Sequence, residues 1–105
     1  MKDKIQALQI KLPGIIKNIR QDRDEAMGDF SGIFMELNEI MISFVNIIPV
    51  LNENGVEISA DIITRQLENV VNGYEQKDII LLADSLEYEI MESLQVYMEI
   101  LEQIQ

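Results

Sequence analysis

Residues 74–105 repeat apolar side chains at intervals of three and four residues, which places them on one side of an α-helix. A helix with so wide an apolar stripe is not stable alone in water, so the rest of the chain has to supply partner helices. The repeating positions are Ile79, Ala83, Leu86, Ile90, Leu94, Tyr97, Leu101 and Ile104.

Two earlier segments carry stripes of the same kind, and polar, glycine-containing turns separate them. Asp29, Ser59 and Asp78 stand where N-caps are expected, and Pro49 is expected to bend or fray the end of the second helix. The stripe of the second helix consists of Phe30, Ile33, Leu37, Ile40, Phe44, Ile47 and Leu51. The stripe of the third helix consists of Ile63, Leu67, Val70 and Tyr74.

The first stripe runs across Pro13 and Gly14 without losing its helical phase. Proline inside a helix costs about 3 kcal/mol and glycine about 1 kcal/mol, so we expect this helix to kink or to break at Pro13. Its apolar positions are Ile5, Leu8, Leu12, Ile15 and Ile19.

Four stripes joined by short connections predict an all-α protein, folded as an antiparallel up-down four-helix bundle with a kinked or broken first helix. The whole chain, residues 1–105, forms a single domain in this interpretation. The alternative is a domain-swapped or dimeric bundle, in which the helix before Pro13 packs on a second copy.

The net charge of −11 argues against nucleic-acid binding, because phosphate contacts need clustered Lys and Arg. Residues 1–23 carry +4 and residues 24–105 carry −15. We therefore expect the basic first helix to lie beside the acidic last one; the alternative is a basic arm for a membrane surface or an acidic partner. Residues 41–51, the most apolar run, are too short to span a bilayer, and no signal-peptide pattern opens the chain, so we expect a cytoplasmic protein.

Reactive side chains are scarce. The chain has no cysteine and no histidine, which removes thiolate chemistry and the commonest general base. No glycine-rich phosphate loop follows a strand, so we expect no enzyme and no cofactor. The best metal candidate is the pair Asp84 and Glu87, which lie on one helical face and could hold Mg²⁺ or Ca²⁺ weakly.

The last helix has more apolar residues than one stripe needs, and methionine and aromatic side chains adapt well to different partners. We therefore predict a non-catalytic protein–protein interaction module that binds a partner helix, or a second copy as a homodimer, through Leu82, Tyr88, Met91 and Met98. Two alternatives remain: a weak carboxylate metal-binding regulatory protein, and an acidic mimic of nucleic acid.

Residues 74–78 read YEQKD and residues 82–89 read LADSLEYE. This YExKD…LADxLEYE block resembles a family of short uncharacterised bacterial helical proteins. The four-helix layout is also similar, in architecture only, to the small flagellar export chaperones. The first resemblance implies no known activity. The second implies a chaperone-like or adaptor-like role.

Overall fold

The computed structural model describes residues 1–104, and over that range the chain forms helices and no strands, which confirms the all-α prediction. Gln105, the end of the predicted last helix and domain, lies outside the described residues. Three helices are followed by a last helix that has a π-helical middle. Their bounds are α1 Lys2–Arg20, α2 Ala26–Glu53, α3 Ala60–Glu75, and, in the last helix, α4 Ile79–Asp84, η1 Ser85–Ile90 and α5 Met91–Ile104.

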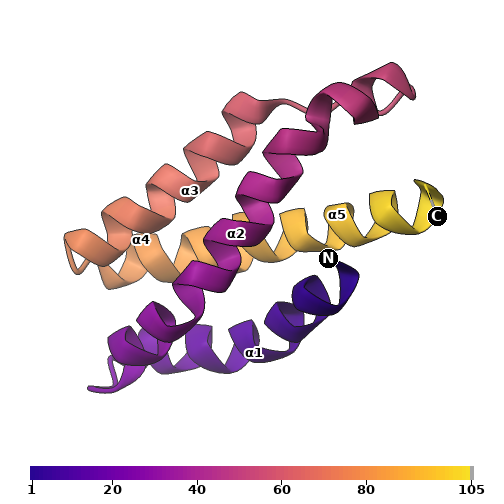
Figure 1. Ribbon diagram of the computed structural model, residues 1–105. Coiled ribbons are helices and arrows are strands. Elements are labelled where there is room, and N and C mark those ends of the chain that lie inside the picture. Colours follow the sequence, from indigo (N-terminus) through magenta and orange to yellow (C-terminus); the bar gives the residue numbers. More distant parts are fainter. Residues whose placement is uncertain (105) are drawn as a thin grey trace.

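Helix α1 packs against α2 and against the last helix, and α3 also packs against α2 and the last helix. Figure 1 shows the α1–α2 and α3–α4 connections at one end of the molecule, and the α2–α3 connection at the other. The prediction that the basic first helix lies beside the acidic last helix is therefore correct. Arg20 Nη2 lies 3.0 Å from Asp84 Oδ1 across this interface, and Gln9 Nε2 donates to Gln95 Oε1 at 3.1 Å.

The predicted stripes form most of the core, with small shifts of phase. Ile16 is buried while Ile15 is only half-buried, and Ile48 likewise takes the buried place next to Ile47. Ile104, the last residue of the predicted final stripe, is 51% exposed. The stripes therefore point inward as expected, except at the last position of the final one.

Helix α1 runs through Pro13 without a break, so of the two predicted outcomes, a kink or a break, the break is wrong. Pro13 and Gly14 are exposed on the outer side of the helix. There, water can hydrogen-bond to the carbonyl oxygen that Pro13, which has no N–H, leaves without a donor. The five buried side chains of α1 each contribute about 1.5–3 kcal/mol, which outweighs the cost of one proline. Figure 1 shows the ribbon of α1 bending part-way along, as expected for an internal proline.

Helix α2 begins before Asp29, which lies in its first turn and is not the N-cap. Ala26 is 2% exposed, and its burial in the core favours an earlier helix start. Pro49 does not end the helix either, because it is exposed and α2 continues to Glu53. The other two N-cap positions are as predicted, and the Asp78 carboxylate accepts from the Leu81 amide at 3.0 Å.

The π-helical segment η1 was not predicted. Leu82, Leu86, Ile90 and Leu94 are all fully buried, although they are separated by three successive steps of four residues. An α-helix has 3.6 residues per turn, so such a series drifts around its surface. A π-helical turn contains more residues and absorbs this drift, so the buried series keeps facing the core.

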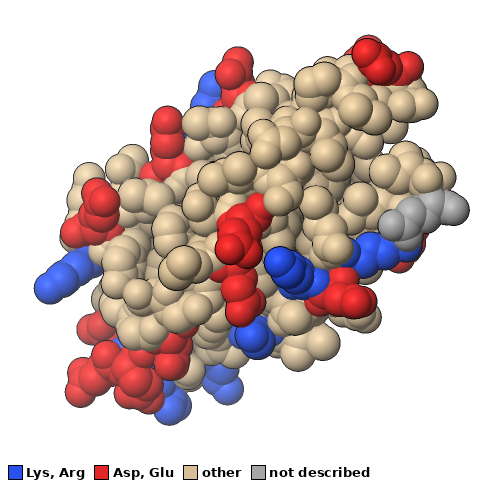
Figure 2. All heavy atoms as spheres, viewed as in Figure 1, with Lys and Arg blue, Asp and Glu red and all other residues tan. Residues whose placement is uncertain are grey.

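Helix α2 has 28 residues, with a stretch of mean hydropathy 1.5, and by length and composition it is able to cross a membrane. The expectation that no segment spans a bilayer rests on residues 41–51, a shorter run inside this helix. Core helices of soluble proteins pass the same test, and nine side chains of α2 are buried against the other helices. Figure 2 shows charged side chains crowded at the α1–α2 end, and a broad uncharged surface over the far half of α2.

Candidate functional site

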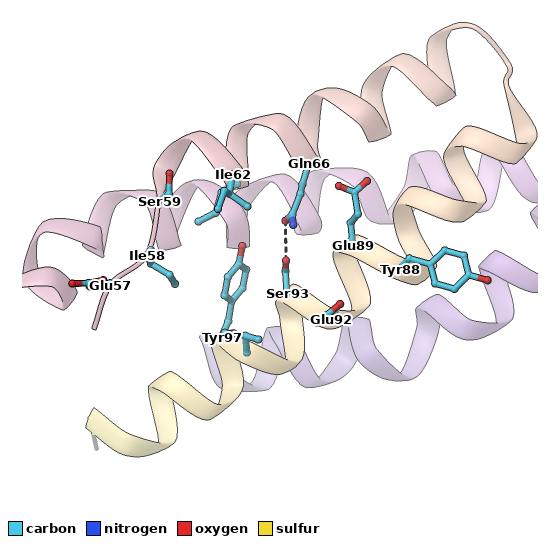
Figure 3. A pocket seen from close by; sticks show the side chains of 12 residues that line it. Glu57, Ile58, Ser59, Ile62, Gln66, Tyr88, Glu89, Glu92, Ser93 and Tyr97 are labelled. Atoms are coloured by element: carbon cyan, nitrogen blue, oxygen red, sulfur yellow. Dashed lines mark hydrogen bonds between the residues drawn. The ribbon is translucent and has the colours of Figure 1, made fainter. Parts of the chain in front are cut away.

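A groove of about 420 Å³ lies between the start of α3 and the last helix, and we call it the α3 groove. Its walls are apolar: Ile62 from α3 is 55% exposed and Val96 from α5 is 40% exposed. Ile58 and Ile63 extend the apolar lining toward the core. Figure 3 shows Ile62 and Gln66 of α3 facing Tyr97 and Ser93 of the last helix.

Two polar contacts join the walls of the α3 groove. Ser93 Oγ donates to Gln66 Oε1 at 2.8 Å, and Asn69 Nδ2 donates to Glu89 Oε1 at 3.4 Å. Both contacts are partly buried and connect α3 to the last helix (Figure 3 draws the first). They join α3 to the last helix along the groove, so the two helices that form its walls are in place before a ligand binds.

Tyr97 forms the floor of the α3 groove and is 3% exposed. Its ring stacks on Phe44 of α2, with 4.0 Å between ring centroids and 19° between the planes. Its hydroxyl has no hydrogen-bond partner within residues 1–104. Burial raises the pKa of Tyr97 to about 12, with a smaller opposing effect from Ser93. The hydroxyl is therefore protonated at neutral pH, and leaving it unpaired costs about 1–3 kcal/mol.

The rim of the α3 groove is acidic. Glu57, Glu89 and Glu92 line it, and none of them forms an ion pair in the part of the chain that the structure describes. Carboxylates beside low-dielectric walls attract cations more strongly than the same groups spread over an open surface. An apolar trough with uncompensated negative charge along its edge suits a ligand that is both apolar and basic.

The residues predicted to bind a partner separate into three environments. Tyr88 is 63% exposed and begins at the edge of the groove, but its ring points away from it toward Arg20, whose guanidinium lies 5.9 Å from the ring centroid. Met91 and Met98 are half-buried against the core. Leu82 is fully buried, so its prediction as a partner-binding residue is wrong.

The burial of Leu82 has a clear cause in the neighbouring helix. A Cβ atom added to Gly73 of α3 would lie 2.8 Å from the Leu82 nitrogen and 2.9 Å from its Cα. The missing side chain at Gly73 therefore lets α4 approach α3 closely.

The predicted metal pair, Asp84 and Glu87, instead holds an arginine. Arg20 Nη2 lies 3.0 Å from Asp84 Oδ1 and 3.4 Å from Glu87 Oε2. The hydrogen bond to Asp84 raises the pKa of Arg20 above its ordinary value, so the guanidinium stays charged. No group of three or more potential metal-ligating side chains occurs within residues 1–104.

We therefore expect Mg²⁺, Ca²⁺ and Mn²⁺ to bind no tighter than the millimolar range, because a fixed positive charge already sits between the two carboxylates. Isothermal titration calorimetry of the protein and of Arg20→Gln checks this. Heat from the unsubstituted protein at micromolar metal would contradict the expectation. Binding that appears only in the variant would show that Arg20 blocks the site.

Sequence reasoning missed the α3 groove. Ile62, Gln66 and Ser93 lie beside the predicted stripes, and Tyr97 lies within one. The sequence contains part of the signal for the contact between Gln66 and Ser93. Both are polar residues next to core positions, and they lie on helices that were expected to be neighbours. Periodicity places such residues on a helix, but it does not show that they meet across an interface.

A family described as a domain of unknown function, DUF8042, matches residues 1–100. The chain belongs to the DUF8042 family. No curated protein and no solved structure matched the chain. The matched region contains every residue of the α3 groove, so the groove is part of the DUF8042 domain itself. Membership agrees with the expected resemblance to uncharacterised proteins, whereas the sequence block and the likeness to flagellar export chaperones stay predictions.

Proposed function

We propose that this DUF8042 protein is a non-catalytic protein–protein interaction module of the cytoplasm. It is built as an antiparallel up-down four-helix bundle, and it binds a basic, apolar helical segment of a partner in the α3 groove. One observation carries the proposal: the groove combines exposed apolar walls with three carboxylates that form no ion pair in the described chain.

The apolar walls give a partner its anchoring area. Ile62 and Val96 keep about half of their surface exposed, and both line the groove. An amphipathic helix binds such a groove through side chains spaced by three and four residues. Burial of apolar area drives the association, and aromatic or aliphatic anchors in a groove contribute most of the affinity.

The acidic rim selects the charge of the partner. Glu57 stands at one end of the groove, and Glu89 and Glu92 stand along the last helix. Complementary charge raises the association rate and rejects partners of the same sign. Because the chain as a whole carries −11, an acidic segment is disfavoured at long range and at the groove alike.

An amphipathic lysine–leucine peptide is expected to bind the protein, and its glutamate–leucine counterpart is not. Fluorescence anisotropy with labelled peptides measures both affinities, and affinity for the basic peptide should fall as salt is raised. Val96→Lys places a like charge in the groove and should weaken binding about tenfold or more.

The matched control is Ile80→Lys, which makes the same charge change at a residue of the last helix that is 72% exposed and lies outside the groove. It should change the affinity by less than about threefold, an effect of net charge alone. Equal losses in the two variants would show that the peptide binds through the overall charge, and would contradict the groove as its site.

A further inference from the structure

The hydroxyl of Tyr97 is the one polar group at the α3 groove whose burial nothing in the described chain explains. Tyr97 is 3% exposed, and its oxygen has no hydrogen-bond partner among residues 1–104. The neighbouring Ser93 hydroxyl directs its only proton to Gln66, so it has none to donate to the Tyr97 oxygen, whose acceptor lone pairs stay unused. A phenylalanine would keep the stack on Phe44 without burying an unpaired oxygen.

The position of this hydroxyl points to a ligand in the groove. Figure 3 shows Tyr97 rising from α5 toward α3, with its oxygen ending beside Ile62 and next to the Ser93–Gln66 pair. Ile62 is 55% exposed, and although χ1 of a β-branched residue in a helix is held in one rotamer, rotation about χ2 can move its terminal methyl at little cost. Movement of Ile62 would open the oxygen to the groove.

We propose that the Tyr97 hydroxyl is a recognition group of the α3 groove, and that it accepts a hydrogen bond from a lysine ammonium of the bound segment once Ile62 moves aside. This inference rests on the proposed function and names the chemistry at the floor of the same groove. Glu89 and Glu92 at the rim balance the charge of the inserted lysine.

The floor favours lysine over arginine. An ammonium on a slender stem can direct one of its three donors to a single oxygen and leave the other two to water in the groove. A planar guanidinium brings five donors in a fixed fork, and the floor offers only one unpaired oxygen. The high pKa of the phenol, about 12, keeps the group neutral, so the contact is a hydrogen bond and not an ion pair.

Tyr97→Phe tests this role. The variant should fold, unfold at the same or a higher temperature because an unpaired buried hydroxyl is removed, and bind the lysine–leucine peptide about tenfold more weakly. Tyr88→Phe is the matched control, because Tyr88 is 63% exposed and its ring points out of the groove. The affinity of this variant for the lysine–leucine peptide should be unchanged. An arginine–leucine peptide should bind the unsubstituted protein more weakly than the lysine peptide.

A double-mutant cycle identifies the contact. In a set of peptides, each lysine in turn is replaced by norleucine. One of these replacements should lower the affinity for the unsubstituted protein but leave the affinity for Tyr97→Phe unchanged. The inference would be overturned if Tyr97→Phe bound the peptide with unchanged affinity, or if the loss from every lysine replacement simply added to the loss from Tyr97→Phe. The groove would still be supported in that case if Val96→Lys weakened binding. No binding of the lysine peptide to the unsubstituted protein would overturn the proposed function and this inference together.

Discussion

Leu86→Ala is expected to lower the free energy of unfolding by about 2–5 kcal/mol, the range measured for large-to-small substitutions in well-packed cores. Leu86 is fully buried in η1, and η1 packs against both α1 and α3. Removing its side chain leaves a cavity where these helices meet, and the surrounding backbone can collapse into it only in part. Urea denaturation followed by circular dichroism measures the change.

Ile80→Ala is the control for Leu86→Ala, because Ile80 belongs to the same last helix and is 72% exposed. Its effect should stay within about 0.5 kcal/mol. A loss below about 1 kcal/mol for Leu86→Ala would mean that the side chain does not lie in the core. The π-helical turn would then not present the Leu82–Leu86–Ile90–Leu94 series to the interior.

The helical class and most of the core could be predicted because apolar periodicity is a local property of the sequence. Leu8 and Leu37, for example, lie at stripe positions and are fully buried. The uneven charge along the chain predicted that the basic first helix lies beside the acidic last one, and Arg20 contacts Asp84 there. What periodicity determines is which face of a helix turns inward.

The features that periodicity missed depend on how two helices meet. Leu82 was predicted to lie on the surface, because nothing in the stripe pattern shows that α3 approaches α4 so closely. Asp84 and Glu87 were predicted as a metal site from their spacing on one helical face. Their actual partner, Arg20, is far away in the sequence and reaches them only through helix packing, which periodicity does not show. The α3 groove is a third example, since Gln66 and Ser93 come together only in the folded chain.

The continuity of α1 through Pro13 was not predicted for another reason, which is the balance between a local cost and tertiary packing. The local cost of proline was judged correctly, but the buried residues on both sides of it, Leu12 and Ile16, pack into the same core. Tertiary packing therefore decides the outcome against a local penalty of about 3 kcal/mol. The sequence showed the unbroken phase of the stripe, and that signal was the better guide.

The closest backbone approach at any glycine of the described chain is that of α3 and α4 at Gly73. Gly73 is buried, and the atoms that an added Cβ would meet are the nitrogen and Cα of Leu82. Backbone atoms inside a helix cannot move aside singly, so any side chain at this position forces the two helices apart. Helix α4 continues into η1 and α5, which are joined to α3 by the hydrogen bonds of Asn69 and Gln66, so the strain cannot relax locally.

Gly73→Ala is therefore expected to destabilise the protein by about 1–3 kcal/mol, although alanine is the better helix former by about 1 kcal/mol. Gly32→Ala is the matched control, because Gly32 lies inside α2 with open space around its Cα and should gain about 0.5–1 kcal/mol. Denaturant titration of both variants gives the comparison. If Gly73→Ala were as stabilising as Gly32→Ala, α3 and α4 would not pack as closely as the structure shows, and Leu82 would lose the reason for its burial.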